Sequence, residues 1–224
     1  MSVSEDRTVQ PSPITTAPPS GIADPAPLGL AAFALTTFLL SAKNANWMTH
    51  ATGSAWLGYA FAYGGLAQLL AGMWEFRNRN VFGATAFATY GGFWIGLGLW
   101  VQLVANPAVA AIKPATLVTT VTALNHDLGW ILLAFAIFNT YMLILSTQVS
   151  MAVFGVFLTL EATEIILCIG NFNAGAALNP TTTIKIGGYV GLVTALVAWY
   201  TSAAGVSNGI AGKLRFPVGR PLIS

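Results

Sequence analysis

Charged residues are scarce in this chain, which has 224 residues, 7% of them charged and 55% hydrophobic. Soluble domains carry about 25% charged residues, so this composition excludes an ordinary water-soluble enzyme. The formal net charge of +2 is small and dispersed along the sequence, which argues against a nucleic-acid partner. The protein is therefore expected to act in or across a membrane.

Cysteine and histidine are nearly absent as well, with one Cys and two His residues. Cys168 alone cannot form an intrachain disulfide, and we interpret it as a small packing residue. No His, Cys or carboxylate cluster has metal-ligand spacing, and no nucleophile or cofactor motif is present. We therefore expect no metal, no cofactor and no enzymatic activity.

The start of the chain lacks a secretory signal, because residues 1–22 are rich in Pro, Ser and Thr and contain no apolar block. We predict three regions. Residues 1–23 are expected to be a disordered cytoplasmic tail, residues 24–206 a six-helix membrane domain, and residues 207–224 a short cytoplasmic tail.

Long apolar segments dominate the rest of the sequence. A hydrocarbon core about 30 Å thick needs about 20 apolar helical residues. The runs are continuous rather than alternating, which favours helices over a β-barrel. We predict an all-α polytopic membrane protein with six transmembrane helices, with a loop and a short interfacial helix over 105–127. The predicted spans are 27–42, 54–74, 83–104, 128–147, 150–169 and 184–204.

The basic residues predict how these spans are oriented. With the N-terminus inside, six of the nine Lys and Arg residues lie in cytoplasmic segments and three lie outside. Both termini are therefore expected to be cytoplasmic, in a multi-pass protein of the plasma (inner) membrane.

Two carboxylates, Glu161 and Glu164, lie in the middle of the fifth predicted span. An ionised side chain at that depth costs at least about 2.5–3.5 kcal/mol. Three residues apart, they share one helical face, and at low dielectric at least one is expected to be protonated near neutral pH. They are candidates for a proton relay; the alternative is that hydrogen bonds to neighbouring helices make both purely structural.

Other polar and aromatic residues at membrane depth are candidates for a substrate path. An aromatic in a Gly-rich span, such as Phe33 or Tyr90, can narrow a pore. Polar side chains can contact a substrate, although packing or helix termination explains them equally well. The polar candidates are Thr36, Gln68, Asn171 and Asn173.

Several long motifs occur in one order: Asp24–Leu30 (DPAPLGL), Tyr63–Glu75 (YGGLAQLLAGMWE), Asn80–Trp94 (NVFGATAFATYGGFW) and Gly188–Gly191 (GYVG). Through them the chain resembles the acetate uptake transporter family, which includes bacterial succinate–acetate permeases and fungal acetate and ammonia-export proteins. The resemblance covers roughly residues 24–205.

The resemblance implies a six-helix protomer in a homo-hexamer, with one path per protomer for acetate and related short-chain carboxylates. Transport in the family is described as proton-coupled, and channel-like behaviour is also proposed. By motif position, the family's hydrophobic constriction falls on Phe33, Tyr90 and Leu160. The implied partners are a small carboxylate, protons, the lipid bilayer and further copies of the chain, and no nucleic acid.

This sequence departs from the family pattern in two places. Asp24 replaces the Asn of the signature; it can cap a helix but cannot donate to an anion when ionised. Glu161 and Glu164 stand where the family usually has apolar or Thr residues, which leaves substrate range and coupling open.

Two other functions are compatible with the sequence. One is a membrane sensor or scaffold without transport, since Gly-rich faces suit helix packing. The other is a small-solute channel of aquaporin type, because Asn106-Pro-Ala108 matches that motif. Its second copy would be Asn179-Pro-Thr181, which differs at the third residue.

Overall fold

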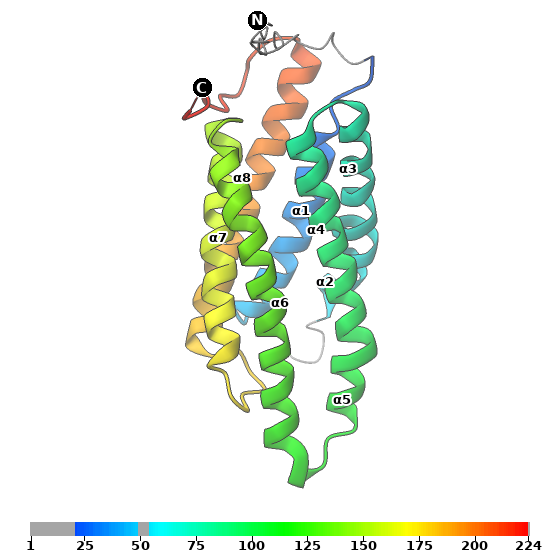
Figure 1. Ribbon diagram of the computed structural model, residues 1–224, viewed down its shortest axis with the longest axis vertical. Coiled ribbons are helices and arrows are strands. Elements are labelled where there is room, and N and C mark those ends of the chain that lie inside the picture. Colours follow the sequence, from blue (N-terminus) through cyan, green and yellow to red (C-terminus); the bar gives the residue numbers. More distant parts are fainter. Residues whose placement is uncertain (1–20, 49–53, 224) are drawn as a thin grey trace, which may run out of the picture.

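The computed structural model describes residues 21–48 and 54–223, which form a bundle of long helices along one axis (Figure 1). Over these residues the chain is all helical, which confirms the predicted class. The predicted N-terminal tail lies outside them up to residue 20. The elements are α1 (Ala26–Asn44), α2 (Ala55–Phe61), π-helical η1 (Ala62–Ala67), α3 (Gln68–Arg77), α4 (Val81–Trp100), π-helical η2 (Val101–Ala105), α5 (Asn106–Ala110), 3₁₀-helical η3 (Pro114–Thr116), α6 (Leu117–Ser146), α7 (Met151–Phe172) and α8 (Thr182–Ala211).

Five helical stretches are long and apolar enough to cross a membrane: Ala26–Asn44, Val81–Ala110, Pro114–Ser146, Met151–Phe172 and Thr182–Ala211. They make this a multi-pass integral membrane protein. The second predicted span is the helical stretch α2–η1–α3, which does not meet the same criterion. Its middle turn widens to π-helix over Ala62–Ala67, which includes Tyr63-Gly-Gly65.

The loop predicted over 105–127 is wrong. The helix that begins with α4 continues through η2 and α5 to Ala110, and helical structure resumes at Pro114 (Figure 1). Pro107 lies within this continuous helix, and the π-helical turn Val101–Ala105 just before it accommodates the residue that lacks a backbone N–H. In the Thr-rich segment, Thr119 Oγ1 donates to Thr116 O at 3.0 Å, so this hydroxyl is satisfied by the backbone of its own segment.

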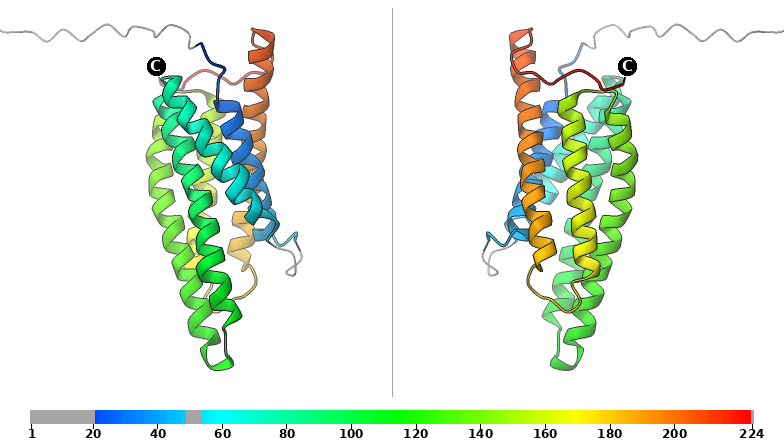
Figure 2. Two further views of the ribbon diagram at one scale, coloured as in Figure 1. Left: turned by 90° about the vertical axis from the view of Figure 1, so that its right-hand side faces the viewer. Right: turned by 90° about the vertical axis from the view of Figure 1, so that its left-hand side faces the viewer.

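Helix α1 lies between the two parts of the bundle. It packs along α8, which packs on α7, which in turn packs on α6, while α3 and α4 form a second pair that α1 also contacts (Figure 2). The start of α1 lies beside the end of α8, where Ser202 Oγ donates to Pro27 O at 2.6 Å. Helices α4 and α6 contact each other only sparsely.

Close approach of α8 to α1 depends on two glycines. A Cβ atom at Gly188 would collide with the backbone at Asn44–Ala45, and one at Gly191 would collide with the Ser41 side chain. This confirms the expectation that these glycines let the helix backbones meet. Gly92 and Gly96 on α4 differ, since a Cβ at either would meet nothing within 4 Å.

The C-terminal segment folds back over the end of the bundle. Gly212 has φ 60° and ends α8, after which Ala152 N donates to Val218 O at 2.8 Å. Leu222 N donates to Thr147 O at 2.7 Å, and Tyr200 Oη to Pro217 O at 2.6 Å. The segment predicted as a tail therefore binds the α6–α7 turn and α8.

Candidate functional site

The three predicted constriction residues meet inside the bundle. Phe33 from α1, Tyr90 from α4 and Leu160 from α7 are 4%, 3% and 6% exposed, and the Phe33 and Tyr90 rings contact edge-on at 5.8 Å between centroids. All three line one cavity of about 50 Å³. The other residues around it are Thr37, Leu40, Ser41, Asn44, Phe93, Trp94, Leu132, Thr163, Glu164 and Leu167.

Aromatic rings surround Tyr90 on the side of α4 and α6. Its ring centroid lies 6.3 Å from that of Phe93, 6.1 Å from Phe135 and 5.5 Å from Phe138. Phe93 and Phe135 also contact each other at 4.6 Å. These contacts restrict the rotation of Tyr90 and hold its hydroxyl toward α6 and α7.

A chain of polar contacts begins at that hydroxyl. Tyr90 Oη lies 2.9 Å from Asn139 Oδ1 and 3.3 Å from Glu164 Oε1. Asn139 Nδ2 donates to Phe157 O at 3.0 Å and to Glu161 Oε2 at 2.6 Å, and Thr140 Oγ1 lies 2.8 Å from Glu161 Oε1. Each polar group on this side of the bundle is thus held by a neighbouring helix.

The two carboxyls that the sequence places on one helix face have different surroundings in the structure. Glu164 is 4% exposed and lines the cavity, and its Oε2 has no hydrogen-bond partner within the described part of the chain. Glu161 is half-buried at the α6–α7 contact and does not line the cavity. Only Tyr90 and Asn139 connect them.

Two further buried polar groups line the cavity, and sequence analysis did not select either as a site residue. Thr37 Oγ1 and Trp94 Nε1 also have no partner among the described residues. Asn139 was missed as well. Its position in the middle of an apolar span is a usable signal, because an amide at that depth needs a partner. Trp94 carries no such signal, since a buried Trp is ordinary in a packed span.

The other polar candidates lie outside this cavity. Thr36 Oγ1 bonds Ala32 O at 3.0 Å and faces η1, and buried Gln68 lies on α3. Asn171 donates to Leu167 O at 2.8 Å and Asn173 to Ile169 O at 2.9 Å, both within α7. Just before α1, Asp24 Oδ1 accepts from Ala26 N at 2.9 Å and so satisfies the first backbone N–H of the helix, while Pro25 takes the N-cap position.

The aquaporin-type motif does not form the arrangement that such a channel needs. Asn106-Pro-Ala108 lies at the far end of the α4–α5 helix with Asn106 exposed, and Asn179-Pro-Thr181 is in the connection before α8. The motifs do not lie on facing half-helices in the bundle, so the structure gives this alternative no support.

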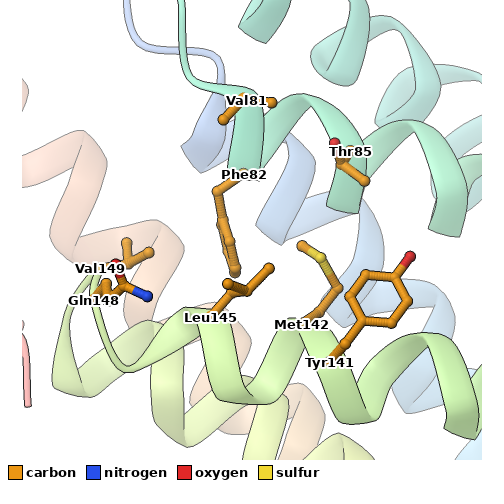
Figure 3. Close-up of a pocket in the computed structure, with 8 residues that line it drawn as sticks. All are labelled: Val81, Phe82, Thr85, Tyr141, Met142, Leu145, Gln148 and Val149. Atoms are coloured by element: carbon orange, nitrogen blue, oxygen red, sulfur yellow. The ribbon is translucent and has the colours of Figure 1, made fainter. Parts of the chain in front are cut away.

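A second cavity, of about 310 Å³, lies where the start of α4 diverges from the end of α6 (Figure 3). Phe82 points from α4 toward Leu145 on α6, and Tyr141, Met142 and Gln148 also come from the α6 side. None of the predicted site residues lines it. Within residues 21–48 and 54–223, no group of three or more His, Cys, Asp or Glu residues could hold a metal ion.

The sequence profile of the GPR1/FUN34/yaaH family matches residues 6–219. The chain belongs to this family. Acetate permease A of Emericella nidulans is 41% identical over an alignment of 206 positions that covers 88% of this chain and 65% of the permease. The succinate-acetate/proton symporter SatP of Escherichia coli is 32% identical over 198 residues, covering 88% of this chain and 96% of SatP.

A solved structure, that of the bacterial acetate channel SatP, superposes with a TM-score of 0.74 at 30% identity. It covers 88% of this chain and 99% of the channel. The match therefore covers nearly the whole bacterial channel. By contrast, the chain spans about two thirds of the length of the fungal relatives that it matches.

Proposed function

We propose that this protein carries acetate and related short-chain carboxylates across the membrane, along a path through each protomer that narrows at Phe33, Tyr90 and Leu160. The observation that carries the proposal is their convergence. Three residues from three helices, selected by family motif, line a single narrow cavity inside a bundle with the fold of an acetate channel. Proteins named as an acetate permease and a succinate-acetate/proton symporter are relatives at 41% and 32% identity.

The physical scheme is dehydration followed by neutralisation. Apolar side chains at the narrowest point force a carboxylate to lose water, which is costly for an ion at low dielectric. A carboxylate that crosses together with a proton is neutral overall and avoids most of that cost. We assign contact with the substrate and the proton that it carries to Glu164, which lines the cavity, and assign to Glu161 the role of joining α6 and α7 through Asn139 and Thr140.

The wider arrangement is proposed in the same way. The stretch α2–η1–α3 is proposed as the sixth crossing, both termini as cytoplasmic, and the membrane as the plasma membrane. The adjacent start of α1 and end of α8 support an even number of crossings. We propose residues 24–206 as the transport domain, with the segments before and after it at the cytoplasmic face, and a homo-hexamer of such protomers.

Flux into sealed vesicles tests the function. Purified protein in liposomes should take up labelled acetate faster than empty vesicles, and an inward acid gradient should accelerate uptake. Unlabelled propionate, lactate, succinate and ammonium, each tested at two pH values, should show which species competes. Vesicles that exclude acetate at every gradient would instead favour a sensor or scaffold.

A further inference from the structure

We propose that Thr37, Trp94 and Glu164 form a carboxyl-pairing subsite, which binds a short monocarboxylic acid in its protonated form beside the ring of Phe33, Tyr90 and Leu160. This inference rests on the proposed transport function and deepens it, since it specifies the chemical form of the substrate that binds.

Three residues that line the cavity carry polar atoms without hydrogen-bond partners. Thr37 Oγ1, Trp94 Nε1 and Glu164 Oε2 are buried without a hydrogen-bond partner among the described residues, and all three residues line the same space. Their side chains are 5%, 2% and 4% exposed. A buried polar atom without a partner destabilises a protein, so three around one cavity indicate that a polar ligand completes them.

The Tyr90 hydroxyl has one proton and makes two polar contacts. Asn139 uses both Nδ2 protons on Phe157 O and Glu161 Oε2, so its Oδ1 is an acceptor. The single Tyr90 hydroxyl proton goes to that acceptor at 2.9 Å, the shorter of its two contacts. Tyr90 Oη also lies 3.3 Å from Glu164 Oε1. Because the phenol proton is already used, we infer that Glu164 is protonated and donates to the phenol oxygen in this contact.

A Glu164 protonated on Oε1 keeps its other oxygen, Oε2, as a buried and unpartnered acceptor on a residue that lines the cavity. The Trp94 indole can only donate, and the Thr37 hydroxyl can donate in turn. One acceptor and two donors match a carboxylic acid: its O–H donates to Glu164 Oε2, and its carbonyl oxygen accepts from Trp94 or Thr37. An ionised carboxylate has no proton for Glu164 and would place an uncompensated charge in a buried site.

None of the described residues that line the cavity carries a positive charge that could hold an anion. The titratable groups that act on Glu164 are Glu161 on its own helix and Tyr90 on α4, and Tyr141 on α6 acts on Tyr90. From α1 the cavity receives Phe33, Thr37, Leu40, Ser41 and Asn44, and it receives no residue of α8. A neutral ligand therefore suits the site better than an anion.

Cavity size limits the ligand. On the measure by which the cavity has about 50 Å³, one water needs about 10–15 Å³, so the space holds about three or four water-sized groups, as many as a two-carbon monocarboxylic acid has. A four-carbon diacid would need the surrounding side chains to move. Its second carboxyl would also face the apolar ring.

The test is to count protons during binding. Acetate is ionised at pH 7, so binding as the acid should take up about one proton per acetate from solution. Calorimetric titration of the purified full-length protein with acetate, in two buffers of different ionisation enthalpy, gives this number without any transport assay. The subsite requires an uptake close to one; an uptake near zero overturns it.

Substitutions decide whether Glu164 is the acceptor. Glu164→Gln can turn its amide oxygen to the cavity and its N–H to Tyr90, so acetate affinity should stay within about threefold of the original with the same proton uptake. Glu164→Leu keeps the bulk without the acceptor and should weaken binding about tenfold or more. A Gln variant that loses binding as Leu does would overturn the proposed arrangement.

Trp94→Phe and Thr37→Val each remove one donor with little change of shape and should weaken binding several-fold. Trp56→Phe is the matched control: its Nε1 is equally buried and unpartnered, but it lies outside the cavity, so affinity should not change. Equal affinities in Trp94→Phe and Trp56→Phe would count against the subsite. These conservative changes also decide the matter if Glu164→Leu fails to fold.

Flux measured on the same preparation separates the two proposals. Acetate flux without proton uptake on binding refutes the subsite and leaves the transport function standing. A protein that neither binds nor moves acetate refutes the transport function itself.

Discussion

Phe33 sets the width of the cavity from the side of α1. Its ring is 4% exposed and faces Tyr90 edge-on. Phe33→Ala removes this bulk, so vesicles carrying the variant should admit larger acids, with succinate uptake rising relative to acetate uptake. The measurement is the ratio of the two initial rates in liposomes.

Phe157→Ala is the matched control for this change. Phe157 is also buried and makes an edge-on contact, with Phe82 at 5.2 Å, but it does not line the cavity. Each substitution should cost about 3–5 kcal/mol of stability by analogy with soluble cores. Only Phe33→Ala should change the ratio; an equal change in both variants would mean that loose packing, not the constriction, sets selectivity.

Glu161 offers a second prediction at this scale. Its two oxygens accept from Asn139 and contact Thr140, so Glu161→Gln replaces one acceptor with a donor and weakens the α6–α7 contact. We expect a loss of about 1–3 kcal/mol, observed as a lower apparent Tm in detergent. The stability loss of the double variant Glu161→Gln, Thr140→Val should be smaller than the sum of the two single losses, since the two residues contact each other.

The pH dependence of acetate uptake tests whether Glu161 also takes part in proton transfer. An amide does not carry protons readily, and Asn139 stands between Tyr90 and Glu161. Acid stimulation of acetate uptake should therefore persist in Glu161→Gln. A flat pH response would restore the relay through both carboxyls.

Motif position selected Phe33, Tyr90 and Leu160, and the structure places all three around one cavity, while their role as a constriction stays a prediction. The sequence could not tell the roles of Glu161 and Glu164 apart. Residues three apart share one helix face, and only the neighbouring helices that pack against each of them make their surroundings differ. Thr37 and Thr36 show the same limit: adjacent and chemically identical, one lines the cavity and the other bonds its own helix.

At the scale of elements, hydropathy was sufficient for the long helices, and it failed between the third and fourth spans. Apolar windows mark where lipid can cover a helix, and they do not predict how far the helix extends beyond the window, as α6 does by beginning at Leu117. The π-helical turn of η1 was also unpredictable, since it depends on contact: a Cβ at Gly64 would collide with Thr36 on α1.

Helix α8 provides the prediction for this scale. Gly188→Ala places a methyl group against the α1 backbone, where no flexible side chain can move away, so the apparent Tm should fall by several degrees. Gly209→Ala on the same helix meets nothing within 4 Å and should be neutral or slightly stabilising, because Ala favours a helix by about 0.5–1 kcal/mol. Equal effects at both sites would show that helix propensity, not the α1–α8 contact, determines the result.

For the whole molecule, the informative feature is a helix face that the protomer leaves uncovered. Gly92 and Gly96 lie four apart on α4, both are exposed, and a Cβ at either would meet nothing within 4 Å. In membranes, small residues with this spacing allow the close approach of a second helix. This face is where we expect a neighbouring protomer of the proposed hexamer.

Replacing both glycines with Leu should therefore block that approach. Native mass spectrometry should show the protein shifting from hexamer to smaller species, whereas Gly209→Leu, an equally open position near the end of α8, should leave assembly intact. Because the cavity is built from α1, α4, α6 and α7 of one chain, acetate flux per protomer should survive the loss of assembly. An intact hexamer in the double variant would place the interface on another face. Loss of flux together with assembly would mean that the path needs contacts between protomers, and the single-protomer scheme would then fail.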